Sequence, residues 1–153
     1  MAMSLNSKIK EKLLTRCIEI KEESKANTLA AMNDAQQGAN EYGAPRDRYD
    51  SFRAQLMRKR DMLAQQLAVV EDEIRFLRQI KPGSISTKVE AGALVMLDSQ
   101  TLFILAGIGK LVIDDETFYV VSPVVPLVQA MKDLKQGDSF SFRGTSMKIL
   151  EIL

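Results

Sequence analysis

The sequence predicts an α+β protein with an N-terminal antiparallel coiled-coil helical hairpin, followed by a small antiparallel sheet domain with one short helix. Two long stretches repeat apolar residues every three or four positions, which is the helical period. A single break between Gly38 and Pro45 separates them. After Lys81-Pro82-Gly83-Ser84 the apolar period changes from helical to two. We therefore expect a hairpin domain over residues 1–80 and a sheet domain over residues 84–153.

The first helix is predicted to begin near Ser4 and to end near Gln37. Its apolar seam weakens in the middle, where small polar residues replace larger ones. The predicted seam consists of Leu5, Ile9, Leu13, Cys17, Ile20, Ser24, Thr28 and Ala31.

The second helix is predicted to run from Pro45 or Arg46 to about Ile80. Apolar residues recur every seven positions in a charged background, as in a coiled-coil seam. The predicted seam consists of Tyr49, Phe52, Leu56, Leu63, Leu67, Val70, Ile74 and Leu77. So short a connection requires antiparallel helices. A helix of roughly 35 residues spans about 50 Å, so we expect the hairpin to project and to carry a functional tip.

Short apolar runs after the linker predict four or five antiparallel strands. Ser122, followed by Pro123, is a suitable N-cap for a short helix reaching Leu134. The apolar runs from which these strands are expected to form lie at residues 93–97, 101–105, 110–113, 117–121, 139–142 and 147–152.

Composition excludes several classes of protein. The net charge is +1, and neither half has the basic excess of a nucleic-acid-binding domain. The chain has no histidine, which removes imidazole bases and histidine metal ligands. The single cysteine, Cys17, lies in the seam and is expected to be buried. No apolar run is long enough to span a membrane, so we expect a cytoplasmic protein.

The order of these parts resembles the GreA/GreB transcript cleavage factors of bacteria. The residues that carry the resemblance are Val121-Ser122-Pro123-Val124, Gly137-Asp138, the strand 148–152, and Asn40-Glu41-Tyr42 near the hairpin tip. The resemblance extends over essentially the whole chain, but the spacing from Ser-Pro to Gly-Asp is a few residues longer than is usual in the family.

The resemblance implies a C-terminal domain with the fold of FK506-binding proteins (FKBP-like), docked at the entrance of the RNA polymerase secondary channel. Ser122, Pro123 and Val124 are the implied polymerase-binding residues. The hairpin would enter the channel, where its tip could contact RNA or DNA indirectly. In active members, an Asp-x-x-Glu pair at the tip helps to hold a magnesium ion for hydrolysis of backtracked RNA.

Placing Glu41-Tyr42 on the corresponding family segment puts Ala35 and Gly38 at the two acidic positions. We therefore expect a transcription elongation regulator that binds polymerase, is not an enzyme and has no cofactor. The candidate tip residues are Asp34, Gln36, Gln37, Asn40, Glu41, Tyr42 and Arg46.

Other interpretations stay open at this stage. Asp34 and Glu41 could together hold magnesium and support cleavage, provided that the helix continued through Gly38. A coiled-coil adaptor or holdase would use the hairpin to bind other proteins. Each tip residue also fits an ordinary solvated turn. Prolyl isomerase activity is disfavoured, because so small a domain needs its few aromatic residues for the core.

Overall fold

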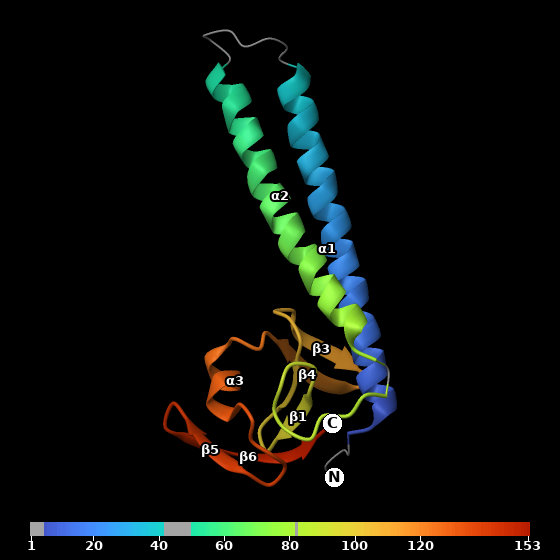
Figure 1. The fold of residues 1–153 in the computed structure, drawn as a ribbon, viewed down its shortest axis with the longest axis vertical. Coiled ribbons are helices and arrows are strands. Elements are labelled where there is room, and N and C mark those ends of the chain that lie inside the picture. The colour runs from blue at the N-terminus through green and yellow to red at the C-terminus, as the bar shows by residue number, and fades with distance from the viewer. Residues whose placement is uncertain (1–4, 42–49, 82) are drawn as a thin grey trace. The chain divides into compact units, whose positions relative to one another are not determined.

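The computed structural model describes residues 5–41, 50–81 and 83–153. In these residues, two long helices are followed by six strands and one short helix. This arrangement confirms the α+β class (Figure 1). The chain divides into two compact units, one formed by Met1–Cys17 with Gln79–Leu153 and the other by Ile18–Arg78. The predicted domain ranges, 1–80 and 84–153, stay a prediction.

The two long helices, α1 (Ser7–Glu41) and α2 (Asp50–Gln79), lie side by side and run antiparallel in the unit Ile18–Arg78 (Figure 1). A half-buried ion pair joins them, with 3.2 Å between Lys21 Nζ and a Glu73 carboxylate oxygen. In the described ranges, no helix is long and apolar enough to cross a membrane.

The predicted break at Gly38 is wrong, because α1 continues through this residue to Glu41. Glycine inside a helix costs about 1 kcal/mol relative to alanine. Here the missing side chain makes room for α2, since a Cβ added at Gly38 would lie 3.3 Å from Leu56 Cδ1. The glycine thus fits a close contact between the two helices, although its own helix propensity is weak. Phe52, predicted in the seam, is 44% exposed.

In the part of the chain that the structure describes, six strands form one sheet in the order β3-β4-β2-β1-β6-β5. The predicted antiparallel arrangement holds for all of these pairings except one, because β2 and β4 run parallel. After β2 the chain crosses to the edge of the sheet and forms β3. It then returns as β4, which lies between β3 and β2. The strands are β1 (Leu94–Leu97), β2 (Thr101–Ile104), β3 (Gly109–Ile113), β4 (Glu116–Val121), β5 (Ser139–Phe142) and β6 (Thr145–Ile152).

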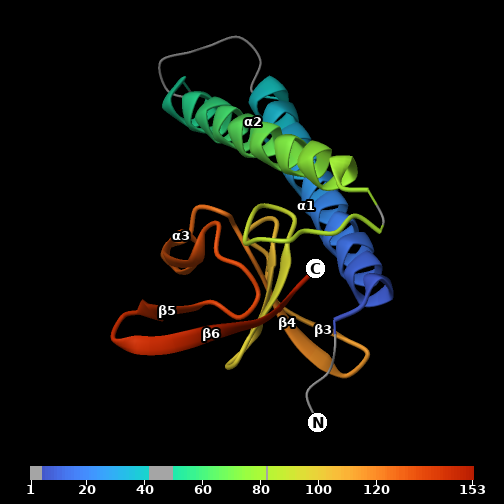
Figure 2. The ribbon, with the colours of Figure 1, turned by 60° about the horizontal axis from the view of Figure 1, so that its bottom comes forward.

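The centre of the sheet is buried on both faces. All four residues of β1 are buried, so this strand shows no alternation between core and solvent. One face packs against α3 (Pro126–Met131; Figure 2). This helix contributes Val128 and Met131 to the core cluster. On the other face, the side chains of Phe103 and Phe118 are fully buried, with 0% exposure.

The start of α3 differs from the prediction. Ser122 is not its N-cap, because the helix begins at Pro126 with Val125 as N-cap residue. The sequence Ser-Pro-Val-Val-Pro contains two prolines that could occupy the first helical turn, and the second one does so. Pro123 instead belongs to the turn that leads into the helix.

Candidate functional site

The last turns of α1 carry the acidic tip candidates on one exposed face. Asp34 and Glu41 are seven residues apart, which is nearly two full turns, and both are exposed. Gln37 lies between them and is also exposed. The condition that the sequence left open is therefore met, because the helix does continue through Gly38.

The spacing along the helix separates these two carboxylates. Seven residues correspond to about 10 Å of rise, whereas residues three or four apart have Cβ atoms about 5–6 Å apart. Magnesium needs its oxygen ligands at about 2.0–2.1 Å. Direct sharing of one ion by Asp34 and Glu41 is therefore unfavourable on a continuous helix. Among the described residues, no group of three or more metal-ligating side chains is close enough to hold a metal ion.

The two positions that the resemblance assigns to the acidic pair point toward α2. Ala35 is 5% exposed, and Gly38 faces Leu56. A carboxylate at either position would enter the packing between the helices instead of solvent. The structure thus gives Ala35 and Gly38 a packing role, and the exposed face lies at Asp34, Gln37 and Glu41.

Two other tip candidates take part in a network within the hairpin. The side chain of Arg60 on α2 donates a hydrogen bond to Gln36 Oε1, and Gln36 Nε2 donates to Asn40 Oδ1 at 2.9 Å. Arg53 Nε donates to the Ala39 carbonyl oxygen at 3.3 Å, in the last turn of α1. A cation at a helix C-terminus satisfies free carbonyl groups and favours the helix dipole. Tyr42 and Arg46 lie outside the described residues.

The predicted docking segment forms a tight turn with an exposed apolar residue. Ser122 Oγ accepts a hydrogen bond from Val124 N, and the Ser122 carbonyl oxygen accepts one from Val125 N, each at 3.3 Å. Gln129 Nε2 donates to the Pro123 carbonyl oxygen at 2.8 Å. Val124 is 76% exposed, although its backbone is held by this turn. The segment therefore presents a fixed apolar side chain to solvent.

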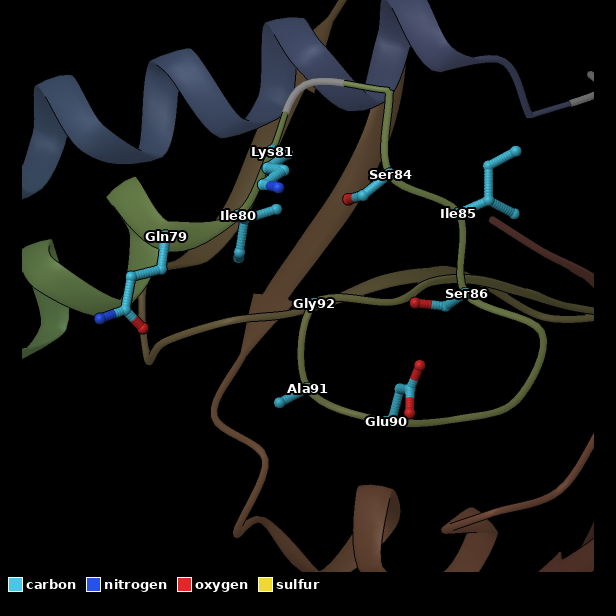
Figure 3. Close-up of a pocket in the computed structure, with 9 residues that line it drawn as sticks. All are labelled: Gln79, Ile80, Lys81, Ser84, Ile85, Ser86, Glu90, Ala91 and Gly92. Carbon is cyan, nitrogen blue, oxygen red and sulfur yellow. The ribbon is translucent and has the colours of Figure 1, made fainter.

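A pocket of about 340 Å³ lies between the linker after α2 and the loop that precedes β1 (Figure 3). Its lining includes Lys81, Ser84, Ser86 and Glu90, together with the apolar side chain of Ile85. None of the predicted site residues that the structure describes lines this pocket.

Lys10 is a buried charged residue that the sequence analysis did not single out. Its Nζ donates to the Ser84 carbonyl oxygen at 3.0 Å and to the Leu153 carbonyl oxygen at 2.8 Å. Burial lowers the pKa of Lys10 below its ordinary value, and the Glu90 carboxylate opposes this shift. Lys10 thus ties α1 to two distant backbone segments.

Lys10→Met should change how stability depends on pH. Because the folded pKa is below the unfolded one, the unfolded chain binds more protons between these two values. The contribution of Lys10 to stability should therefore rise with pH through this window, up to the unfolded pKa of about 10.4. Urea denaturation of both proteins from neutral pH to about 10.4 measures the difference in free energy of unfolding. Lys8→Met, at an exposed position on the same helix, is the control; an equal pH trend for both variants would contradict the argument.

Sequence periodicity contained a signal for the burial of Lys10 and for the contacts of Arg60 between the helices. Lys10 precedes Leu14 by four and Cys17 by seven residues, which places it on the apolar face of α1. Arg60 lies four residues after Leu56 and three before Leu63, so it interrupts the apolar series on α2. A lone cation in an apolar stripe indicates a buried amine or guanidinium with specific partners.

Comparison of the sequence with models of protein families and with curated proteins finds no match. Among solved structures, the chain is similar to the GreA factor homolog 1 (Gfh1) protein of Thermus thermophilus, with 15% identity, a TM-score of 0.34, and 93% of each chain covered. It is also similar to Thermus aquaticus Gfh1, with 16% identity, a TM-score of 0.32, and coverage of 95% of this chain and 94% of that one.

Proposed function

We propose that this protein is a Gre-like transcription elongation regulator that binds RNA polymerase without stimulating transcript cleavage. The C-terminal domain would dock at the entrance of the secondary channel, and the helical hairpin would occupy the channel. The observation that carries the proposal is the end of α1, where Ala35 is buried and the exposed acids Asp34 and Glu41 stand seven residues apart.

The geometry of α1 supports the absence of cleavage. Cleavage by the family requires two carboxylates close enough to help hold one magnesium ion. On α1, the face that carries Asp34 and Glu41 has an amide, Gln37, where a second nearby acid would be needed. The helix itself is stabilised by bonds from Arg53 and Arg60, so it remains suited to occupying a channel.

The turn at Ser122–Val124 supports docking through the C-terminal domain. An exposed valine on an ordered backbone can insert into an apolar depression of a partner with little loss of backbone entropy. Val124→Glu should therefore weaken binding to RNA polymerase by at least about tenfold, which corresponds to about 1.4 kcal/mol. Titration of labelled protein with purified polymerase measures this. Val112→Glu, at an exposed valine of β3, is the control; equal affinity of Val124→Glu and the parent protein would count against the docking surface.

Cleavage is tested with stalled elongation complexes that carry labelled RNA. The parent protein, Asp34→Ala and Glu41→Ala should all leave the cleavage rate at its value without factor. Gln37→Glu places a carboxylate three residues after Asp34 on the same exposed face, and it should increase cleavage if the hairpin reaches the catalytic centre. Rapid cleavage by the parent that is lost in Asp34→Ala would overturn the proposal. Failure of the folded protein to bind polymerase at all would favour an adaptor function instead.

A further inference from the structure

We infer that β5 is a self-association edge, where the β5 strands of two copies of this chain pair antiparallel. Among the residues that the structure describes, β5 is the last strand of the sheet and pairs only with β6. Edge strands are usually protected by lysine, proline or a bulge. The opposite edge strand, β3, carries the exposed Lys110, whereas β5 is Ser-Phe-Ser-Phe without any of these protections.

The register of the β5–β6 hairpin shows which backbone groups face outward. Phe142 pairs with Thr145 across the two-residue turn Arg143-Gly144, so these residues form the first hydrogen-bonded pair. From this pair toward the other end of the hairpin, hydrogen-bonded and non-hydrogen-bonded pairs alternate. The amide and carbonyl groups of Ser139 and Ser141 therefore point away from β6, and they are available to another strand.

A two-fold antiparallel pairing uses all of these groups at once. When Ser139 of one copy pairs with Ser141 of the other, both serines of both copies exchange backbone hydrogen bonds. In this register, Phe140 lies opposite Phe140 of the second copy. Phe140 is half-buried against the core cluster of its own sheet, so the pairing extends apolar contacts that already exist.

The charges at the two ends of β5 favour a second copy over an unrelated strand. Asp138 precedes β5 and Arg143 follows it, and both are exposed. The two-fold register brings Asp138 of one copy beside Phe142 and Arg143 of the other, and it does so twice. The Arg143 guanidinium carbon lies 5.0 Å from the centre of the Phe142 ring, which holds the cation at this end of the strand. The edge is therefore complementary to itself in both backbone and charge.

So short an edge should give a weak dimer, because its interface is far below the area of standard stable complexes. Sedimentation equilibrium of the full chain over a wide concentration range should show a monomer–dimer equilibrium. Arg143→Asp opposes like charges at both ends, and Asp138→Lys does the same with the opposite sign. Each variant alone should weaken association about tenfold, whereas an equimolar mixture should recover it because unlike charges then meet.

Ser141→Pro removes an outward amide that β6 does not use, and should abolish the dimer while the monomer stays folded by circular dichroism. Two further variants lie away from this edge. Ser99→Pro is in the turn between β1 and β2, and Lys110→Asp changes the charge of the opposite edge strand, β3. Lys110→Asp is the matched control and should leave association unchanged. A monomer at all concentrations overturns the inference. So does association that Arg143→Asp, Asp138→Lys and Ser141→Pro all leave intact, or a mixture that is no stronger than either charge variant alone.

Discussion

Ala35→Asp is expected to destabilise the packed helices by on the order of 3 kcal/mol, because it places an unpaired carboxylate at a buried position. Ala35 is 5% exposed, and the next buried residue on this face of α1, Ala39, is 0% exposed. Neither position has room for a hydrated charge. The substitution that would restore an acid at the position assigned by the resemblance should therefore damage the hairpin instead of creating a metal site.

Urea denaturation followed by far-ultraviolet circular dichroism measures this loss of helix stability. Gln37→Asp is the matched control, since it adds the same charge to an exposed position two residues away on the same helix. Its effect should stay within about 0.5 kcal/mol. Equal denaturation midpoints for the two variants would mean that Ala35 is not packed against α2 in solution.

Phe103→Ala is expected to lower the free energy of unfolding of the sheet by about 3–5 kcal/mol, the usual cost of removing a buried aromatic ring. Phe103 lies in β2 with no exposed surface, on the face opposite the cluster around α3. A sheet of this size has little stability to spare, so this variant should be largely unfolded under conditions where the parent is folded.

Val112→Ala separates loss of packing from loss of strand propensity. Val112 lies in β3 and is 58% exposed, so its truncation should cost less than about 1 kcal/mol. Thermal denaturation and near-ultraviolet circular dichroism of both variants provide the comparison. A small effect at Phe103 would show that only one face of the sheet carries a core.

Local patterns in the sequence were sufficient for the presence of the two long helices and the approximate positions of the strands, because periodicity acts over a few positions. They were not sufficient for the parallel pairing of β2 with β4, which depends on where β3 lies in the sheet. They also failed at Gly38, where a contact with Leu56 on the other helix outweighs local propensity. In each case the deciding contact comes from a residue distant in sequence.

For the candidate site, the sequence identified Asp34, Glu41 and Val124 but not how they are presented. Whether Asp34 and Glu41 share a face depended on the helix passing Gly38. The roles of Gln36 and Asn40 depended on Arg60, which belongs to the other helix. Either of two prolines, Pro123 or Pro126, could have begun α3. Packing of Val128 and Met131 against the sheet is consistent with a start at Pro126.

The position of β1 between β2 and β6 affects how the protein folds during synthesis. The two long helices follow each other directly in the sequence, so they can pair as soon as α2 has left the ribosome. β1 and β2 can then form a hairpin, but the other edge of β1 stays open until residues 145–152 have been translated. An apolar strand, Leu94–Leu97, is therefore exposed for the synthesis of about fifty further residues. We expect the nascent chain to be most prone to aggregation during this interval, because transiently exposed apolar strands favour it.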